Sequence, residues 1–384
     1  MKRVGNLIEK IADTDNLLFA YYKAAQGKWF KQETRDFALS LQRNIAKLRD
    51  EILSSSPEVG HYQYFNIEDP KPRLICAASF PERVLHHAIM NVCHPYFERQ
   101  LVETTYATRP QKGVYQALGR TRRAARRYRF VAKCDFRRYF DSINHEILKC
   151  KLCRLFKDRA LLSIFDSIVN SYCKTENKGI PIGNLTSQYF ANYYLSSQDH
   201  LCKEQWGVKE YIRYMDDFLL FSNSFQALLE ETEAIRKYSA DALDLTLKPI
   251  VFAETKDGIP FLGYKIFPHK VLLNTRSKRR LKSKIREYDY LLRNEIWSEK
   301  TYLEHVTPLL SFARYGYTKE LRHGLLNGNR LKAPTACFAA EAGTTTLRTA
   351  ASRIGTTILP ATVTTTTASA LSLFPELSIE DGCQ

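Results

Sequence analysis

Two adjacent acids, Asp216 and Asp217, stand between two apolar runs and are the residues best suited to chemistry. The run Tyr211–Met215 leads into them and the run Phe218–Phe221 follows them. Apolar and aromatic stretches on both sides of a short polar pair predict a tight β-hairpin with the acids at its tip. Two carboxylates held this close to apolar strands need a partner that neutralises them. Magnesium is suited to this role because it binds carboxylate and phosphate oxygens together.

A plain polar turn is the alternative interpretation of Asp216 and Asp217, since acid pairs are common in turns. A site that holds two metal ions needs a third carboxylate from elsewhere in the chain. The stretch Phe130–Asp135 predicts a strand that ends in an acid. Because the end of a buried strand is a common place for a catalytic acid, Asp135 is the predicted third carboxylate.

The elements that must position these acids are predicted from the spacing of apolar residues and from turn signals. Pro81 is well placed at the start of a helix that continues to Met90. The other expected elements are helices over most of residues 1–56, a Gly/Pro loop at Gly179–Gln188 that opens the helix Tyr189–Leu195, a helix at 225–242, strands at Leu243–Pro249 and Phe261–Ile266, and basic helices over 275–330.

The charge balance points to a polyanionic partner. The chain holds 57 Lys and Arg against 41 Asp and Glu, a formal charge of +16. Such an excess favours nucleic acid first and an anionic membrane surface second. The segment Arg120–Arg129 holds six arginines and no acid. We interpret it as a phosphate-binding surface, because a solvated helix face would normally carry acids that relieve the repulsion.

The cysteines favour a reducing compartment. Nine cysteines at irregular spacings do not suggest a disulfide framework, so we expect reduced thiols and a cytoplasmic location. Cys150 and Cys153 form a lone pair in a helical stretch, which makes zinc an unfavourable interpretation. No stretch approaches the length of a membrane span, so we expect no membrane partner.

With these stretches in order, the chain resembles a reverse transcriptase. Tyr214–Asp217 resembles the palm hairpin motif of that family, and Asp135–Phe140 resembles its first carboxylate motif. Each motif is weak by itself, and the ordered set over about residues 61–330 carries the resemblance. The other matching blocks are Arg73–Met90 and Tyr106–Leu118 for the fingers, and Gly179–Gln188, Leu243–Lys248 and Phe261–Tyr264 for the palm.

The resemblance implies an α+β fold of the right-hand polymerase type, with fingers, palm and thumb and an antiparallel palm sheet. The implied organisation is a helical N-terminal extension at 1–60, fingers and palm at 61–270, a helical basic thumb at 271–330, and a Thr-rich low-complexity tail at 331–384 that we expect to be disordered.

The implied reaction is RNA-directed DNA synthesis from deoxynucleoside triphosphates, with template RNA and a primer or cDNA strand as partners. Asp135, Asp216 and Asp217 would hold two Mg²⁺ ions. Phe140 stands at the position where, in the family, an aromatic ring excludes the 2′-hydroxyl of a nucleotide and so selects deoxynucleotides. By the same resemblance, the other nucleotide-binding residues are Arg73, Phe136, Ile182 and Gly183, and the primer and template contacts are Gln188, Phe261, Leu262, Gly263 and Tyr264.

One block departs from most of the family. Ile182-Gly183 stands where Gln-Gly is usual, and Ser187-Gln188 stands where Ser-Pro is usual. This variant resembles the enzymes of diversity-generating retroelements, which copy a template-repeat RNA with errors opposite adenine and act with a small basic accessory protein. Two alternatives remain: a group II intron or retron reverse transcriptase, and a catalytically retired RNA-binding palm protein.

The Thr runs of the tail support the same subfamily. They are Thr344–Thr346, Thr356–Thr357 and Thr364–Thr367. A Thr-rich linker is the alternative. Repeated AAC asparagine codons become ACA threonine codons when they are read one base out of register. We therefore expect the coding end to overlap an adenine-rich template repeat.

Overall fold

The computed structural model describes residues 3–67 and 72–327, which fall into two compact units. Of these residues, 3–67, 72–117 and 128–254 form the first unit, and 118–127 and 255–327 form the second. The predicted Thr-rich tail lies outside the described residues. No helix within the described ranges has the length and apolar character that crossing a bilayer requires.

The N-terminal part of the first unit is helical, as predicted. Four helices pack around the long helix α5, Phe80–Glu98, which carries Pro81 in its first turn. Stacked and edge-on contacts among the rings of Tyr21, Phe37 and Phe80 join the second and third of these helices to α5. The four helices are α1 (Ile8–Ile11), α2 (Thr14–Ala25), α3 (Gln32–Leu39) and α4 (Leu41–Leu53).

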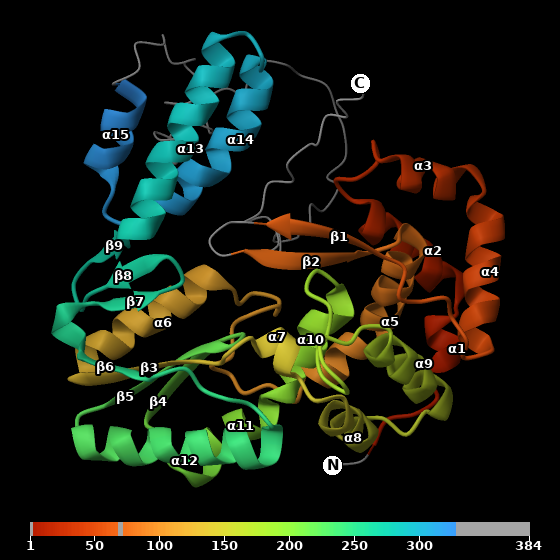
Figure 1. Ribbon diagram of the computed structural model, residues 1–384, viewed down its shortest axis with the longest axis horizontal. Helices are drawn as coiled ribbons and strands as arrows, with labels where there is room; N and C mark the ends of the chain where they lie inside the picture. Colours follow the sequence, from red (N-terminus) through yellow and green to blue (C-terminus); the bar gives the residue numbers. More distant parts are fainter. Residues whose placement is uncertain (1–2, 68–71, 328–384) are drawn as a thin grey trace, which may run out of the picture. The chain divides into compact units, whose positions relative to one another are not determined.

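Two antiparallel sheets follow in the first unit. The smaller one pairs β1, Tyr62–Ile67, with β2, Arg73–Ala78. The larger one has four strands in the order β4, β5, β3, β6, and each neighbouring pair is antiparallel, as predicted for the palm. Its strands are β3 (Phe130–Asp135), β4 (Glu210–Tyr214), β5 (Asp217–Ser222) and β6 (Val251–Glu254). Helix α12, Phe225–Leu243, lies along this sheet and contacts β3 and β5 (Figure 1).

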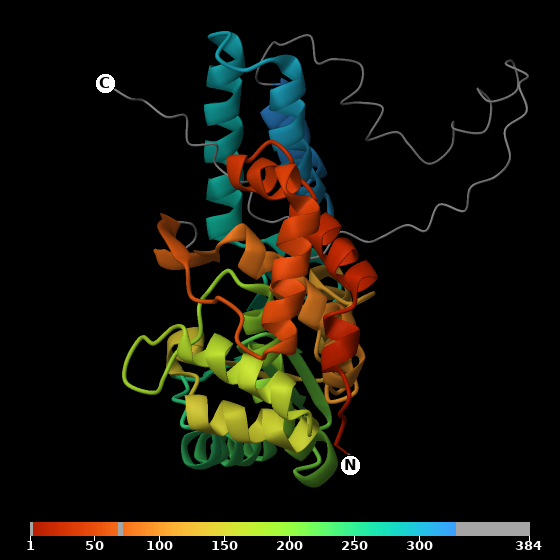
Figure 2. The same cartoon turned by 90° about the vertical axis from the view of Figure 1, so that its right-hand side faces the viewer.

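The segment between β3 and β4 is helical. Helices α8 and α9 lie side by side (Figure 2). The helices are α7 (Tyr139–Ser142), α8 (His145–Leu155), α9 (Arg159–Asn170), α10 (Leu185–Tyr194) and α11 (Ser196–His200), followed by a π-helical turn at Leu201–Gln205. Helix α10 begins at Leu185, four residues before the predicted start, because Thr186 and Ser187 are buried in its first turn. Gln188 therefore lies in a helix rather than in the loop.

The strand predicted at Leu243–Pro249 is wrong. Leu243 ends α12, and the segment after it makes a single antiparallel bridge, between Leu247 and Phe136. The alternation that suggested a strand is the burial of Leu245 and Leu247. Pro249 has no N–H to extend the pairing, so the strand β6 begins only at Val251.

The single strand predicted at Phe261–Ile266 is a hairpin. Leu262 and Gly263, with φ of +47° and +86°, form a two-residue turn between β7 and β8. A Cβ on Gly263 would lie 2.9 Å from the Phe312 ring, so the turn requires glycine. These elements belong to the second unit, which contains β7 (Ile259–Phe261), β8 (Tyr264–Ile266), β9 (Val271–Leu273), a 3₁₀ turn at Thr255–Asp257, and the helices α13 (Thr275–Arg293), α14 (Glu299–Arg314) and α15 (Lys319–Asn327).

Part of the arginine-rich segment has a structural role. It forms the end of helix α6, Val114–Arg127. Arg122 donates a hydrogen bond to the His269 carbonyl at 3.0 Å, and Arg126 donates one to the Pro268 carbonyl at 2.7 Å. These two guanidinium groups therefore hold the turn between β8 and β9. Phosphate binding by this segment remains a prediction.

The loop before α10 lies against β2. The Ile182 carbonyl accepts a hydrogen bond from the Cys76 amide at 2.8 Å, and the Asn184 side chain accepts one from the Ala78 amide at 3.3 Å. Gly183 has φ of +121°, and a Cβ there would lie 3.0 Å from Ile75 and 3.2 Å from the Cys76 carbonyl oxygen. Both the backbone conformation and the close approach to β2 require glycine at position 183.

We expect the substitution Gly183→Ala to lower the free energy of unfolding by about 2–3 kcal/mol, because it adds backbone strain and a steric clash. Urea denaturation measures the loss. The matched control is Gly27→Ala, since Gly27 also has positive φ but no heavy atom within 4 Å of a Cβ. The control should cost about 1 kcal/mol. Equal losses in the two variants would contradict a role for the contact with β2.

Candidate active site

The sheet brings the three predicted acids to one place. In the pairing of β3 with β5, Asp135 lies directly opposite Asp217. Tyr214 pairs with Asp217 across the β4–β5 hairpin, which leaves Met215 and Asp216 as its two turn residues. Asp216 therefore lies at the tip, as predicted, while Asp217 is the first residue of β5. The register alone makes the three carboxylates neighbours.

Two lysines neutralise part of this charge. Lys133 lies two residues before Asp135, on the same face of β3, and its Nζ is 3.0 Å from Oδ2 of Asp217. The Nζ of Lys248 is 2.5 Å from Oδ2 of Asp135. The second oxygen of each acid, Oδ1, is buried and accepts no hydrogen bond from any residue in the described ranges. Each acid thus keeps one oxygen for a further cation.

The surroundings of the acids disfavour their charged forms. Burial raises the pKa of Asp217 to about 7, although the ion pair with Lys133 opposes this shift, and the carboxylates of Asp135 and Asp216 add to it. Burial, and then the nearby Asp135 carboxylate, also raise the pKa of Asp216. A cation bound between the acids would remove much of this cost.

The donor set fits magnesium. It offers three carboxylates, two of which have an unpaired buried oxygen, and a hard divalent cation prefers oxygen ligands. Within residues 3–67 and 72–327, no three His, Cys, Asp or Glu side chains already surround a common metal position. Asp135 and Asp217 are instead each paired with one lysine, Lys248 and Lys133 respectively.

The predicted nucleotide-binding residues in the first unit have different environments. The Phe136 side chain is fully buried against Tyr139 and Phe218, so its ring is not available to a ligand. Phe140 is partly buried, and its ring contacts Tyr139 at a centroid distance of 5.7 Å. Arg73, exposed at the start of β2, is close enough to Asp216 for its charge to lower the pKa of that acid. Ile182 and Gly183 lie in the loop against β2.

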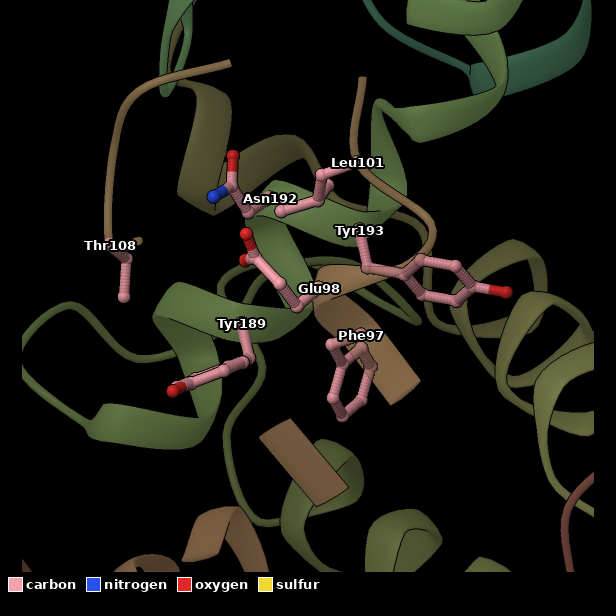
Figure 3. A pocket seen from close by; sticks show the side chains of 7 residues that line it. All are labelled: Phe97, Glu98, Leu101, Thr108, Tyr189, Asn192 and Tyr193. Atoms are coloured by element: carbon pink, nitrogen blue, oxygen red, sulfur yellow. The ribbon is translucent and has the colours of Figure 1, made fainter. Parts of the chain in front are cut away.

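The predicted primer and template contacts are divided between the units. Gln188 lies on α10, where its Oε1 accepts a hydrogen bond from the Thr108 hydroxyl at 3.3 Å. Phe261–Tyr264 forms the β7–β8 turn in the second unit. A small pocket near Gln188 is lined mainly by residues of α5 and α10, has room for about one water molecule, and includes none of the three acids (Figure 3).

Sequence reasoning missed several polar residues near the acids. No role was assigned to Lys133 from the sequence. Residues two apart in a strand lie on the same face, so its spacing from Asp135 was an available signal. Arg213 and Asp199 form a fully buried ion pair beside the hairpin. The available signal for Arg213 was that it is a charged residue inside the apolar run that leads to Asp216. Its partner lies fourteen residues earlier, and the sequence does not show that pairing.

Comparison with known proteins gives a sequence match and similar solved structures. The protein YkfC of Escherichia coli (strain K12) is 25% identical over 274 residues, which span 57% of this chain and 70% of YkfC. A structure of apo telomerase from Candida tropicalis has a TM-score of 0.46 at 14% identity, covering 66% of this chain and 58% of that one. A Candida albicans telomerase in complex with a TWJ fragment of telomeric RNA has a TM-score of 0.44 at 13% identity, covering 73% of this chain and 58% of that one. This chain therefore spans somewhat over half the length of these telomerase chains.

Residues 67–266 match the family described as reverse transcriptase (RNA-dependent DNA polymerase). The matched segment contains both strands that carry the acids and the hairpin turn between β4 and β5. Since the match covers more than half of the 384 residues, the chain belongs to the reverse transcriptase family, whose members are RNA-dependent DNA polymerases, a class of nucleotidyltransferase.

Proposed function

We propose that this protein extends a DNA primer with deoxynucleoside triphosphates on an RNA template. The observation that carries the proposal is the pairing of Asp135 with Asp217, with Asp216 in the adjoining turn. Phosphoryl transfer depends on positioning and charge neutralisation more than on covalent chemistry by the protein. Three carboxylates with unpaired buried oxygens among them are suited to that task.

The carboxylates of Asp135, Asp216 and Asp217 are the residues that would hold two Mg²⁺ ions. Magnesium held by these residues would supply Lewis-acid chemistry, lowering the pKa of the primer 3′-hydroxyl and neutralising charge on the triphosphate. Lys133 and Lys248 each hold one of these acids by a single oxygen, which fixes the side chain while its other oxygen stays unpaired. Arg73, exposed near Asp216, supplies a guanidinium suited to a phosphate.

Phe140 is the proposed sugar-selecting residue. It follows Asp135 by five positions, and contact with Tyr139 limits the motion of its ring. The amide of Ile180 donates a hydrogen bond to the Phe140 carbonyl at 2.9 Å, which also fixes the backbone. A ring at the sugar-binding position would exclude a 2′-hydroxyl by its volume alone.

For the subtype, we propose a diversity-generating retroelement enzyme that copies a template-repeat RNA with errors opposite adenine, together with a small basic accessory protein. The support is Ile182, whose carbonyl is bound to β2 and whose side chain has no hydrogen-bonding group to offer a base pair. A group II intron or retron enzyme would share the three acids. The spectrum of errors therefore separates these subtypes.

We expect Asp216→Asn to reduce Mg²⁺-dependent primer extension on an RNA template by about 10³-fold or more. The reason is that charge stabilisation by a metal site contributes several kcal/mol, and about 1.4 kcal/mol corresponds to a tenfold change in rate. Primer extension with equal amounts of each protein measures the effect. Extension that survives the substitution would refute the metal assignment, and an inactive wild type would favour the retired RNA-binding alternative.

The stability of the same variant is the control. Because the pKa of Asp216 is raised in the folded chain, the contribution of Asp216 to wild-type stability falls as pH rises from about 4 through that raised pKa. Asparagine does not titrate, so the variant should gain stability relative to wild type at pH 8 compared with pH 4. Loss of extension together with lower stability at both pH values would indicate misfolding instead.

Substitution of Phe140 by alanine should open the sugar-binding position. We expect Phe140→Ala to raise the ratio of ribonucleotide to deoxynucleotide incorporation by at least about tenfold, since removing the ring removes the steric block. Single-nucleotide extension with each triphosphate measures this ratio. Phe136→Ala is unsuitable as a control because Phe136 is fully buried. The partly buried Phe252 of β6 is suitable, and Phe252→Ala should leave the ratio unchanged.

Restoring a glutamine should reduce the errors. We expect Ile182→Gln to lower misincorporation opposite adenine by about tenfold, the effect of roughly one hydrogen bond. Sequencing of the cDNA products gives the error spectrum, with Ile182→Val as the control. Unchanged adenine errors in the glutamine variant, or few adenine errors in the wild type, would contradict the subtype. The same subtype requires a second, adenine-variable copy of the repeat near the coding end.

A further inference from the structure

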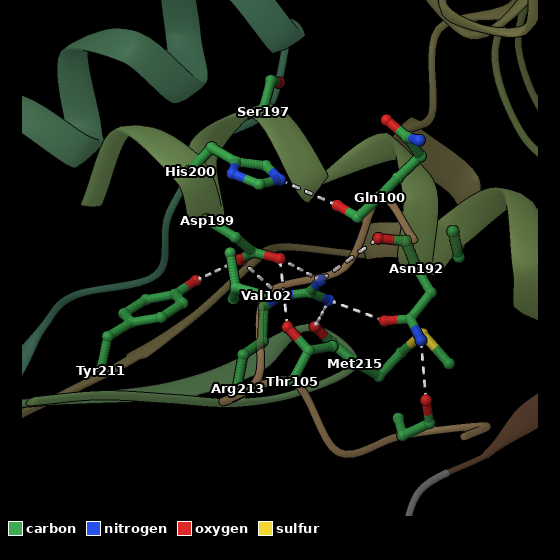
Figure 4. Close-up of polar contacts among 12 residues, drawn as sticks. Gln100, Val102, Thr105, Asn192, Ser197, Asp199, His200, Tyr211, Arg213 and Met215 are labelled. Carbon is green, nitrogen blue, oxygen red and sulfur yellow. Dashed lines mark hydrogen bonds and ion pairs between the residues drawn. The ribbon is translucent and has the colours of Figure 1, made fainter. Parts of the chain in front are cut away.

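Arg213 of β4 is completely buried, and each of its five N–H donors has an acceptor. Its Nε and Nη2 bond the two carboxylate oxygens of Asp199 at 2.8 and 2.5 Å. Nη2 also reaches the Asn192 carbonyl at 3.2 Å, while Nη1 reaches the Asn192 side chain at 3.0 Å and the Met215 carbonyl at 2.9 Å. We call Arg213 with these three partners the Arg213 clamp (Figure 4).

The acid of the clamp is itself fixed. Oδ1 of Asp199 accepts a second hydrogen bond, from the Tyr211 hydroxyl at 2.8 Å, and Oδ2 accepts one from the Thr105 hydroxyl at 3.2 Å. The Asn192 amide donates in turn to the Ala107 carbonyl at 2.7 Å. Asp199 is fully buried, so water does not compete for these bonds. The guanidinium therefore has essentially one position, set by α10 and α11.

The clamp ends on the turn that carries the acids. Met215 has φ of +57°, a left-handed conformation that costs free energy for a non-glycine residue. It is the residue directly before Asp216, and its carbonyl is the one that Arg213 binds. The side chain of a residue two positions earlier thus bonds the strained peptide at the tip. Such strain persists only where the surroundings over-determine the backbone.

Stability alone does not account for this arrangement. Buried ion pairs are often no more stabilising than apolar residues of similar volume, because desolvation offsets the attraction. A guanidinium is instead well suited to geometric control, since its planar donors fix several acceptors at once. Here the acceptors come from two helices and from the hairpin turn.

We propose that Arg213 is a positioning residue for the polymerase reaction, which holds the Met215 peptide so that Asp216 and Asp217 point to a common metal position. This inference rests on the proposed function. It predicts that the clamp affects the chemical step and the response to Mg²⁺ more than substrate binding, because a misplacement of about 1 Å at a reacting centre reduces rate by about 10²-fold.

The test uses the full chain with two variants. Arg213→Lys keeps the charge beside Asp199 but lacks the planar fork that reaches Met215 and Asn192 together. The double variant Arg213→Met with Asp199→Leu replaces the buried pair by apolar side chains, so that no unpaired charge destabilises the fold. Thermal unfolding identifies which variants are folded, and steady-state primer extension gives kcat, the KM for the triphosphate, and the Mg²⁺ concentration for half-maximal rate.

For each folded variant, we expect kcat to fall by about 10²-fold, KM to change by less than about threefold, and the half-saturating Mg²⁺ concentration to rise. Adding Met215→Gly to the double variant should recover about tenfold in kcat, because glycine adopts positive φ without strain. The same substitution in the wild type completes the double-mutant cycle. A role limited to folding would give neither the Mg²⁺ shift nor this recovery.

The outcomes separate the two proposals. An active wild type together with a folded double variant of unchanged kcat and Mg²⁺ response would overturn the positioning role and leave the proposed function intact. A lack of recovery by Met215→Gly would overturn the part of the proposal that concerns the turn. A wild type that does not extend a primer with Mg²⁺ would overturn the proposed function, and the positioning role with it.

Discussion

The antiparallel pairing of β3 with β5 places two carboxylates, Asp135 and Asp217, opposite each other at the end of an apolar sheet. Two like charges on directly opposite residues repel each other, and partial burial further disfavours the charged forms. Lys133 and Lys248 offset part of the repulsion, yet the pKa of Asp217 stays raised and two oxygens stay unpaired. The sheet therefore holds an arrangement that is unfavourable by itself and that a divalent cation would relieve.

The local features that carry the acids could be predicted from the sequence. The apolar runs around Asp216 and Asp217 predict a hairpin, because β-branched and aromatic residues flank a polar pair. The structure contains that hairpin. The strand ending in Asp135 was also correct, as was the antiparallel sheet implied by the family resemblance. Convergence of the acids was predicted from the need of a two-metal site for a third carboxylate and from the family resemblance, since the sequence contains no register. The register places Asp135 directly opposite Asp217.

Features set by tertiary contacts could not be predicted in the same way. Alternating burial of Leu245 and Leu247 mimics a strand, but only long-range pairing distinguishes a strand from a buried extended segment. The turn at Leu262 requires a positive φ at that residue, and the presence of a leucine does not indicate a positive φ. The Arg213 clamp depends on Asp199, which lies in a different element, so residue type alone could mark Arg213 as unusual without naming its partner.

The central claim is that the three acids bind divalent cations together, and counting bound ions tests it most directly. Electron paramagnetic resonance of Mn²⁺ would be measured with primer–template and a non-hydrolysable deoxynucleoside triphosphate present. We expect about two ions per wild-type chain and fewer in Asp135→Asn, while the control Asp166→Asn, which changes a half-exposed acid, should keep the wild-type number. Equal Mn²⁺ occupancy in the wild type and Asp135→Asn would contradict it.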